Sequence, residues 1–160
     1  MKNYTSYDLI EWGKPFEKSQ HALPEPTLSE VLIRVTAAGL CHSDLHVQKG
    51  YMDLGEEGRL TFAERGAQLP MTFGHEIAGI VEAIGDKVKN VSIGQQVIVF
   101  PWIGCGDCLA CNEDRESDCS AMRIIGLKQK GGFATHCLIE NEKFLVNIDG
   151  LDAADVVPHA

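Results

Sequence analysis

Residues 74–88 read GHEIAGIVEAIGDKV, and this stretch decides the fold class. Its apolar run is short and rich in Ile and Val, and Gly79 and Gly85 punctuate it. Such a run predicts a strand rather than a helix, because β-branched residues favour the pleated backbone and glycines mark the corners of curved sheets. We therefore expect a strand over residues 74–85.

The rest of the chain also contains short runs rich in Val and Ile, bounded by Gly, Pro, Asn and Asp. Helical patterns are scarce, with a short turn expected after Cys41 and a helix start at Asp152. This layout predicts a mainly β fold, built as a curled or barrel-like sheet with few short helices. The further expected strands are residues 4–12, 30–39, 96–100, 133–140 and 144–148, and the expected loops are residues 51–68 and 101–125.

The composition favours one globular domain that acts on small molecules. The 160 residues are 44% hydrophobic and 23% charged, which suffices for a single core. Lys and Arg number 14 against 23 Asp and Glu, and the formal charge of −9 disfavours nucleic acid and anionic lipid as partners. The sequence contains neither a membrane-spanning run nor a signal-peptide pattern, so we expect a cytoplasmic protein.

Four cysteines form a dense cluster with the spacing C-x2-C-x2-C-x7-C, at Cys105, Cys108, Cys111 and Cys119. An x2 spacing lets neighbouring thiolates face one ion, and four thiolates leave no open position. The cluster therefore predicts a structural zinc. Free or disulfide-bonded surface cysteines are one alternative. A nucleic-acid zinc module is another, although acidic residues outnumber the single Arg115 among the intervening residues.

A second group of candidate ligands and proton carriers lies at residues 41–46 (CHSDLH) and at the start of the 74–85 strand. Cys41 and His75 can supply sulfur and nitrogen to a second zinc that keeps an open position for a reactant, and Glu76 adds a carboxylate. Asp44 can accept the other ring N–H of a ligating histidine. A hydroxyl and an imidazole, as in Ser43 and His46, suit a proton relay. Taken singly, each residue has an ordinary structural alternative in the core or on the surface.

Together these motifs resemble the N-terminal catalytic domain of zinc-dependent alcohol dehydrogenases, of the medium-chain dehydrogenase/reductase family. Residues 74–88 fit that family's signature G-H-E-x2-G-x5-G-x2-V at every fixed position. The cysteine cluster is similar to its structural-zinc lobe, and residues 41–46 to its first catalytic ligand with the relay. The resemblance implies a GroES-like, partly open β-barrel over residues 1–160 with a zinc lobe at 101–125.

The resemblance also implies an activity and a role for each residue. It implies interconversion of alcohols with aldehydes or ketones, with NAD or NADP as cofactor, one structural and one catalytic zinc per full-length chain, and a homo-oligomer. His42 favours the branch that acts on simple alcohols. The implied roles are: Cys41 and His75, ligands of the catalytic zinc; Glu76, a close neighbour or alternate ligand; Asp44, the partner of His75; Ser43, the contact to the substrate hydroxyl; His46, the outer end of the relay; His42, the contact to the cofactor pyrophosphate.

No G-x-G-x-x-G motif follows a strand, so the chain by itself offers no dinucleotide site. We expect these residues to end before a doubly wound nucleotide-binding domain and to be inactive alone. Two alternatives remain open. One is a noncatalytic zinc-binding β-domain. The other is a family member with a special substrate, such as a formaldehyde–thiol adduct or an activated double bond.

Residues 51–68 are longer than an ordinary connection. They either shape the substrate entrance or form a solvated excursion packed on itself. Large side chains just before the cysteine cluster either line the substrate pocket or belong to the core. The residues in question are Tyr51, Met52, Leu54, Leu60 and Phe62 in the first stretch, and Phe100 and Trp102 in the second.

Overall fold

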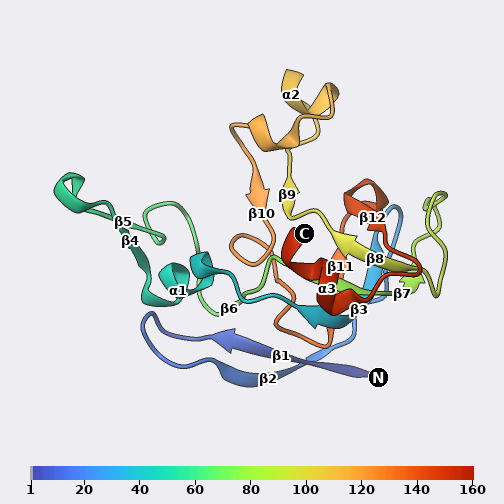
Figure 1. Cartoon of the computed structure of the whole chain (residues 1–160), viewed down its shortest axis with the longest axis horizontal. Helices are drawn as coiled ribbons and strands as arrows, with labels where there is room; N and C mark the ends of the chain where they lie inside the picture. Colours follow the sequence, from blue (N-terminus) through green and yellow to red (C-terminus); the bar gives the residue numbers. More distant parts are fainter. Residues whose placement is uncertain (1) are drawn as a thin grey trace.

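The computed structural model describes residues 2–160, and strands dominate it (Figure 1). The larger sheet has five strands in the order β11-β3-β7-β8-β12, each antiparallel to its neighbours. Its centre is the pair of β3 and β7, in which the predicted 74–85 strand lies. The strands are β3 (Val31–Ala38), β7 (Ile77–Ile84), β8 (Gln96–Val99), β11 (His136–Ile139) and β12 (Leu145–Asn147).

A smaller sheet packs beside it, in the order β2 (Glu17–Ala22), β1 (Asn3–Leu9) and β6 (Met71–Thr72). The two sheets meet along β1, where Ser6 bridges to Ala134 and the Tyr7 N–H donates to the Phe133 carbonyl at 2.8 Å. This junction curls the two sheets toward each other into a partly open barrel, which we call the barrel below. The mainly β fold class predicted from the sequence is confirmed.

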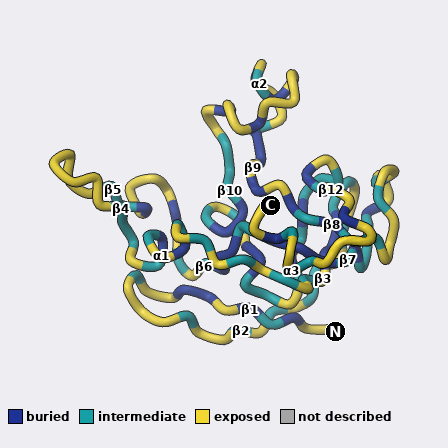
Figure 2. Tube along the Cα trace, viewed as in Figure 1, coloured by how far each residue is buried: buried dark blue, intermediate teal, exposed yellow. Residues whose placement is uncertain are grey.

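The core lies between the strands, and the buried backbone in Figure 2 follows them. Its largest cluster consists mainly of Val and Ile side chains of the larger sheet, joined by Ile103 and Ile125 from residues 101–125 and by Cys137 and Phe144. Val and Ile side chains pack well on a pleated surface, which is why short Val- and Ile-rich stretches suffice here. Fully buried members include Val31, Ile33, Ile77, Val97, Val99 and Ile139.

The six predicted strands are all present, each somewhat shorter than expected. Strand β2 was not predicted, because EKSQHA is polar and lies at a sheet edge without an alternating apolar face. The predicted helices are α1 (His42–Lys49) and α3 (Ala153–Val156), which Asp152 caps by accepting from the Ala154 N–H at 2.8 Å. Two 3-10 turns, η3 (Glu142–Phe144) and η4 (Val157–His159), complete this part of the chain. None of the helices in residues 2–160 has the length and apolarity to cross a bilayer.

The prediction that residues 51–68 form a loop is wrong for their first half. They contain a projecting hairpin of β4 (Tyr51–Asp53) and β5 (Arg59–Thr61), with η1 (Gly55–Glu57) at its tip (Figure 1). Arg59 stacks on the Tyr51 ring at 4.4 Å from its centroid. The two strands have three residues each and no buried face of their own, so they lack the apolar periodicity that would have revealed them.

Residues 101–125 are also more ordered than predicted. They form a lobe on a two-stranded stalk, which projects from the barrel in Figure 1. Ion pairs between Lys143 and Glu116 and between Arg123 and Glu140 link the lobe and its stalk to the barrel. The elements are β9 (Trp102–Ile103), α2 (Leu109–Asn112), η2 (Glu116–Asp118) and β10 (Arg123–Ile124). Their sequences read as loops because each is only two to four residues long.

Candidate metal centres

The four lobe cysteines converge on one point. Their Sγ atoms all lie within 4.8 Å of one another, with Cys105 and Cys111 at 3.9 Å and Cys108 and Cys111 at 3.5 Å. Four thiolates about 2.3 Å from a tetrahedral zinc would lie about 3.8 Å apart, whereas a disulfide needs about 2.05 Å. All four thiols are free. The donor set therefore fits a zinc ion.

The lobe backbone shapes this donor set. Cys108 precedes α2, which carries Cys111, and the Cys105 N–H donates to the Cys119 Sγ at 3.4 Å. Backbone N–H groups of the following residues lower the pKa of Cys105 to about 6, which favours the thiolate that binds metal. Gly104 has to be a glycine, because a Cβ there would collide with the Cys111 sulfur.

The second donor set consists of Cys41, His75 and Glu76, whose ligand atoms also lie within 4.8 Å of one another. Cys41 follows β3, and His75 and Glu76 precede β7. These strands pair antiparallel up to Ala38 opposite Ile77. The register of the central sheet thus brings residues from two distant segments to one place. A thiol, an imidazole and a carboxylate are the donors that zinc takes in sites with an open position, so these residues fit that ion.

Gly39 is a positioning residue that the sequence analysis missed. Its N–H donates to the Glu76 carbonyl at 3.0 Å, which extends the β3–β7 ladder toward the site. A Cβ at this position would collide with the Glu76 carboxylate. A glycine two residues before Cys41, at the end of a predicted strand, is the signal that could have revealed it.

Asp44 contacts both segments that carry the candidate ligands, the one at Cys41 and the one at His75. Its Oδ2 accepts from the Cys41 N–H at 3.0 Å, and its Oδ1 lies 3.5 Å from the His75 Nδ1. The side chain of Asp44 is only 4% exposed. Its hydrogen bond raises the pKa of His75 to about 9 against the opposing effect of burial. This contact orients the imidazole and leaves Nε2 as the nitrogen available to a metal.

The remaining residues of the predicted relay lie on α1. Ser43 Oγ is 3.4 Å from the His75 Nε2, and hydrogen bonds from Ser43 lower the pKa of the Cys41 thiol. The His42 and His46 rings meet edge to face at 4.8 Å between centroids. His46 lines the adjoining cleft, whereas His42 is exposed and does not.

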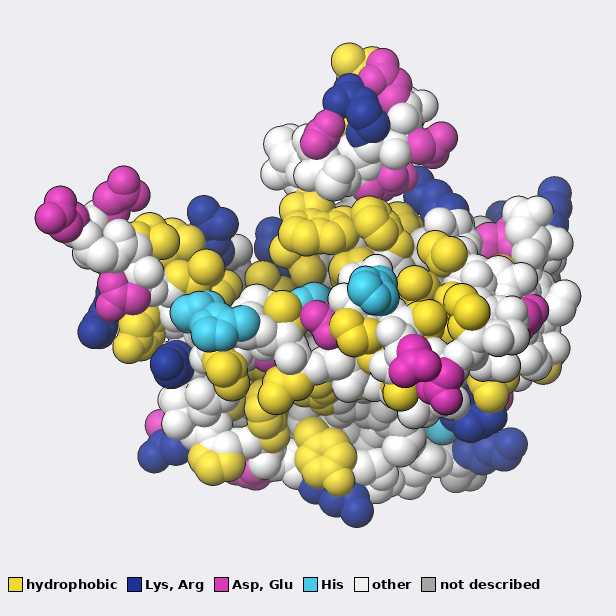
Figure 3. Space-filling model, viewed as in Figure 1, with side chains coloured by type: hydrophobic (Ala, Val, Ile, Leu, Met, Phe, Trp, Pro, Cys, Tyr) yellow, Lys and Arg dark blue, Asp and Glu magenta, His cyan; other side chains and the backbone are white. Residues whose placement is uncertain are grey.

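A cleft of about 620 Å³ opens onto the Cys41 and His75 donors. Its remaining wall is mainly apolar and comes from α1, the hairpin and the turn that follows it, the lobe stalk and the segment after it, and Ala160. Hydrophobic side chains gather below the lobe on the face shown in Figure 3. Of the residues weighed for the entrance, Met52, Phe62 and Trp102 line the cleft. The others, Tyr51, Leu54, Leu60 and Phe100, are not part of its lining.

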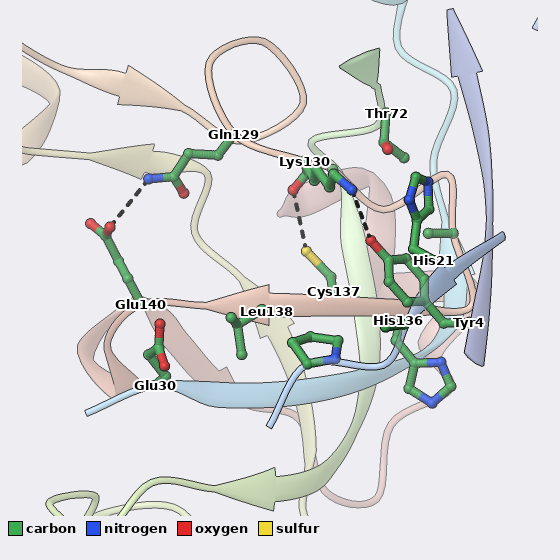
Figure 4. A pocket seen from close by; sticks show the side chains of 14 residues that line it. Tyr4, His21, Glu30, Thr72, Gln129, Lys130, His136, Cys137, Leu138 and Glu140 are labelled. Carbon is green, nitrogen blue, oxygen red and sulfur yellow. Dashed lines mark hydrogen bonds between the residues drawn. The ribbon is translucent and has the colours of Figure 1, made fainter. Parts of the chain in front are cut away.

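A separate cavity of about 470 Å³ lies near β1, β2 and β11 (Figure 4). Its polar groups have hydrogen-bond partners, some within the lining and some beside it. Lys130 Nζ donates to the Tyr4 hydroxyl at 3.3 Å, and Gln129 Nε2 donates to the Glu140 carboxylate at 3.2 Å. Among residues 2–160, two clusters of side chains could bind a metal ion, the four lobe cysteines and the group of Cys41, His75 and Glu76. Neither cluster lies in this cavity. We assign it no function.

The profile of the family described as alcohol dehydrogenase GroES-like domain matches residues 27–150. The chain belongs to this family. The resemblance found in the sequence is thereby confirmed. This alcohol dehydrogenase GroES-like domain is 39% identical over 151 residues to an NAD-dependent alcohol dehydrogenase of Sulfurisphaera tokodaii, a match that covers 94% of this chain and 42% of that protein.

Solved structures agree with the family. The D-arabinose dehydrogenase from Sulfolobus solfataricus superposes with a TM-score of 0.81 at 29% identity, over 99% of this chain and 44% of that one. A cobalt- and zinc-bound thermostable alcohol dehydrogenase from Pyrobaculum aerophilum gives 0.79 at 25% identity, over 98% and 44%. This GroES-like domain thus spans less than half the length of the proteins it matches.

Proposed function

We propose that this GroES-like domain is the metal-binding catalytic part of a zinc-dependent oxidoreductase that interconverts alcohols with aldehydes or ketones, using NAD or NADP. The observation that carries the proposal is the convergence of Cys41, His75 and Glu76 on an apolar cleft. A zinc that served the fold alone would have no need of an open cleft. The three relatives named above are dehydrogenases, which supports the same activity.

In this proposal Cys41 and His75 hold the catalytic zinc, with Glu76 as a close neighbour or alternate ligand. When bound, zinc supplies the Lewis acidity that lowers the pKa of an alcohol hydroxyl toward neutrality. Asp44 fixes the ring of His75, and its bond to the Cys41 N–H fixes the start of α1. The four lobe cysteines hold a structural zinc, which contributes folding energy.

The proton of the alcohol hydroxyl leaves along side chains of α1. The Ser43 hydroxyl, close to the His75 ring, accepts the hydrogen bond of the substrate hydroxyl and passes its proton outward. His46, at the wall of the cleft, takes the proton toward solvent. His42 is exposed at the first position of α1, where it can meet a cofactor pyrophosphate. The nicotinamide supplies the hydride acceptor.

The proposal extends to organisation and location. Residues 1–160 are the catalytic domain, residues 101–125 its zinc lobe, and a nucleotide-binding domain completes the enzyme. We place the protein in the cytoplasm and expect a homo-oligomer that acts on small molecules. The charge of −9 disfavours nucleic acid and anionic membrane surfaces as partners.

Native mass spectrometry of the protein purified from its own cells tests the proposal, because it reports chain mass and bound zinc together. We expect two zinc ions per chain, and the same preparation should reduce NAD or NADP when an alcohol is added. Cys41→Ser should remove one zinc and abolish the reduction, while the lobe zinc stays. A single zinc, held by the lobe and unaccompanied by alcohol-dependent reduction, would establish the noncatalytic alternative.

A further inference from the structure

One charged side chain in the cleft has no part in the chemistry described above. Arg65 lines the cleft together with Cys41 and His75. The other titratable side chains of the lining all belong to the candidate metal site or to its proton route. The remaining side chains in the lining are apolar. Arg65 is exposed, so its guanidinium is accessible to a substrate that reaches the metal donors.

Arg65 also differs from every other arginine of the chain. Each of the other four pairs with a carboxylate, whereas Arg65 has none within ion-pair distance among residues 2–160. Its neighbour Glu64 accepts a hydrogen bond from the Thr61 hydroxyl instead. The four pairs are Arg34 with Glu82, Arg59 with Asp53, Arg115 with Glu113 and Asp118, and Arg123 with Glu140.

The backbone that carries Arg65 is fixed. Its N–H donates to the Phe62 carbonyl at 3.1 Å, and the Ala67 N–H donates to the same oxygen at 3.0 Å. Phe62 in turn donates its N–H to the Gly50 carbonyl, at the end of α1. The side chains of Phe62 and Ala67 are buried in the cluster that includes Val47 of α1. The guanidinium therefore extends from a tight turn anchored to the same helix that carries the relay residues.

The chemistry of arginine indicates what it would bind. The planar guanidinium forms paired hydrogen bonds with carboxylate and phosphate oxygens, and surrounding apolar surface strengthens such a pair. The chain carries a charge of −9, so an anionic molecule is repelled unless a local cation receives it. A neutral alcohol would leave this cation without a partner in the cleft.

We propose that Arg65 selects substrates whose reacting alcohol or carbonyl is joined to an anionic group, a carboxylate or a phosphate, at the other end of the molecule. This inference rests on the proposed dehydrogenase function and narrows its substrate class. Arg65 is a specificity-determining residue in this account and takes no part in the chemical step.

Three substrates of one carbon chain test the proposal with the holoenzyme: ω-hydroxycaproate, hexanediol monophosphate and neutral hexanediol. We expect kcat/KM for at least one anionic substrate to exceed that for hexanediol by roughly tenfold to a hundredfold, as charged hydrogen bonds provide. Arg65→Met should abolish the advantage, measured within that variant as the ratio of kcat/KM for the anionic substrate to kcat/KM for hexanediol, while Arg65→Lys should keep part of it. Arg59→Met is the matched control, because Arg59 lies on the hairpin outside the cleft lining, and it should preserve the preference.

Calorimetric titration of ω-hydroxycaproate and hexanediol monophosphate gives a readout that does not depend on turnover. Arg65→Met should weaken binding of the preferred anion tenfold or more, and Arg59→Met should not. The two anions tell carboxylate from phosphate recognition. Equal kcat/KM for all three substrates, unchanged in Arg65→Met, would overturn the inference and leave the dehydrogenase function standing. If no alcohol is oxidised, the proposed function fails, and the titration alone then decides whether Arg65 binds anions.

Discussion

The two donor sets of this domain are assembled in opposite ways. The lobe thiols of Cys105 to Cys119 come from one short stretch, and their geometry is set by α2 and tight turns. Cys41 and His75 meet only because β3 pairs with β7 in the central sheet. The lobe has no hydrophobic cluster of its own among the described residues, so we expect its folding to depend on the proposed zinc, whereas the cleft site has the central sheet behind it. Stability should therefore depend on the lobe metal, and metal affinity at the cleft should depend on the barrel.

Loss of a lobe ligand should have the largest effect. Cys111→Ser should remove the structural zinc and cost several kcal/mol, a share of the roughly 10–16 kcal/mol with which such sites bind zinc. Native mass spectrometry should show one zinc fewer, and limited proteolysis should cut within residues 101–125. Retention of both zinc ions, or cleavage that starts in the barrel, would show that the lobe does not depend on its metal.

Gly39→Ala should weaken zinc binding at the cleft site and leave the lobe unchanged. The added methyl group would collide with the Glu76 carboxylate, and such overpacking costs about 1–3 kcal/mol. We expect weaker zinc binding at Cys41 and His75, measured by competition with a chelator, and an unchanged lobe. Gly79→Ala is the comparison, because its methyl group would meet the Arg34 carbonyl within the sheet, away from Glu76. If both variants lower zinc affinity equally, general destabilisation is the cause.

Asp44→Asn tests how the second site is oriented. The change keeps the size of the side chain but removes the negative charge of the carboxylate. That carboxylate faces the His75 ring and accepts the hydrogen bond from the Cys41 N–H. Loss of such an outer partner lowers metal affinity by about 10- to 100-fold. Ser43→Ala leaves the contacts of Asp44 intact but removes the hydroxyl that lowers the pKa of Cys41, so it should lower zinc affinity less than Asp44→Asn does, and it should lose activity. Equal zinc affinity in Asp44→Asn and the unaltered chain would contradict the assigned role.

The strand that leads into His75 provides a prediction on pH. Thr72 of β6 donates to the buried Asp8 carboxylate at 2.6 Å. Burial raises the pKa of Asp8, but hydrogen bonds from Thr72, Ser19, Ser6 and His21 outweigh it, so this pKa lies below 3.8. A carboxyl with a depressed folded-state pKa stabilises the fold above its unfolded pKa, and that contribution is lost as pH falls through the folded value.

Asp8→Asn should therefore be less stable than the unaltered chain at pH 7, by about 1–2 kcal/mol. Below about pH 3.8 the difference should shrink, because the unaltered carboxyl becomes protonated there. Urea unfolding of both proteins across this range measures it, and metal loss at low pH affects both alike. A constant difference at all pH values would mean that the charge of Asp8 does not matter.

Cys137 should show the smallest effect, since we expect no reaction at all. Burial in β11 raises the pKa of this thiol to about 12, and it belongs to neither donor set. After zinc is removed by a chelator, alkylation at neutral pH followed by mass spectrometry should find Cys41 and the lobe cysteines modified before Cys137. Cys137 modified as fast as Cys41 would show that the barrel opens when the metals leave.

Sequence reasoning identified the elements whose signal is local. Val- and Ile-rich strands and Asp152 as a helix cap follow from nearby residues alone. It missed β2 and the β4–β5 hairpin, because polar strands at an edge or away from the core show no periodicity. The lobe thiols converge as their spacing predicts, since closely spaced ligands need only one turn to meet.

The sequence by itself determined the mainly β class, the family and the residue types at both candidate metal centres. Only the tertiary structure decided that Gly39 makes room for Glu76, that the walls of the cleft include α1, the hairpin and the lobe stalk, and that Arg65 is the arginine left without a carboxylate. The physical reason is distance along the chain. Spacing and propensity act between neighbours, whereas a steric collision, a cavity wall or a missing ion pair depends on which remote segments the sheet brings together.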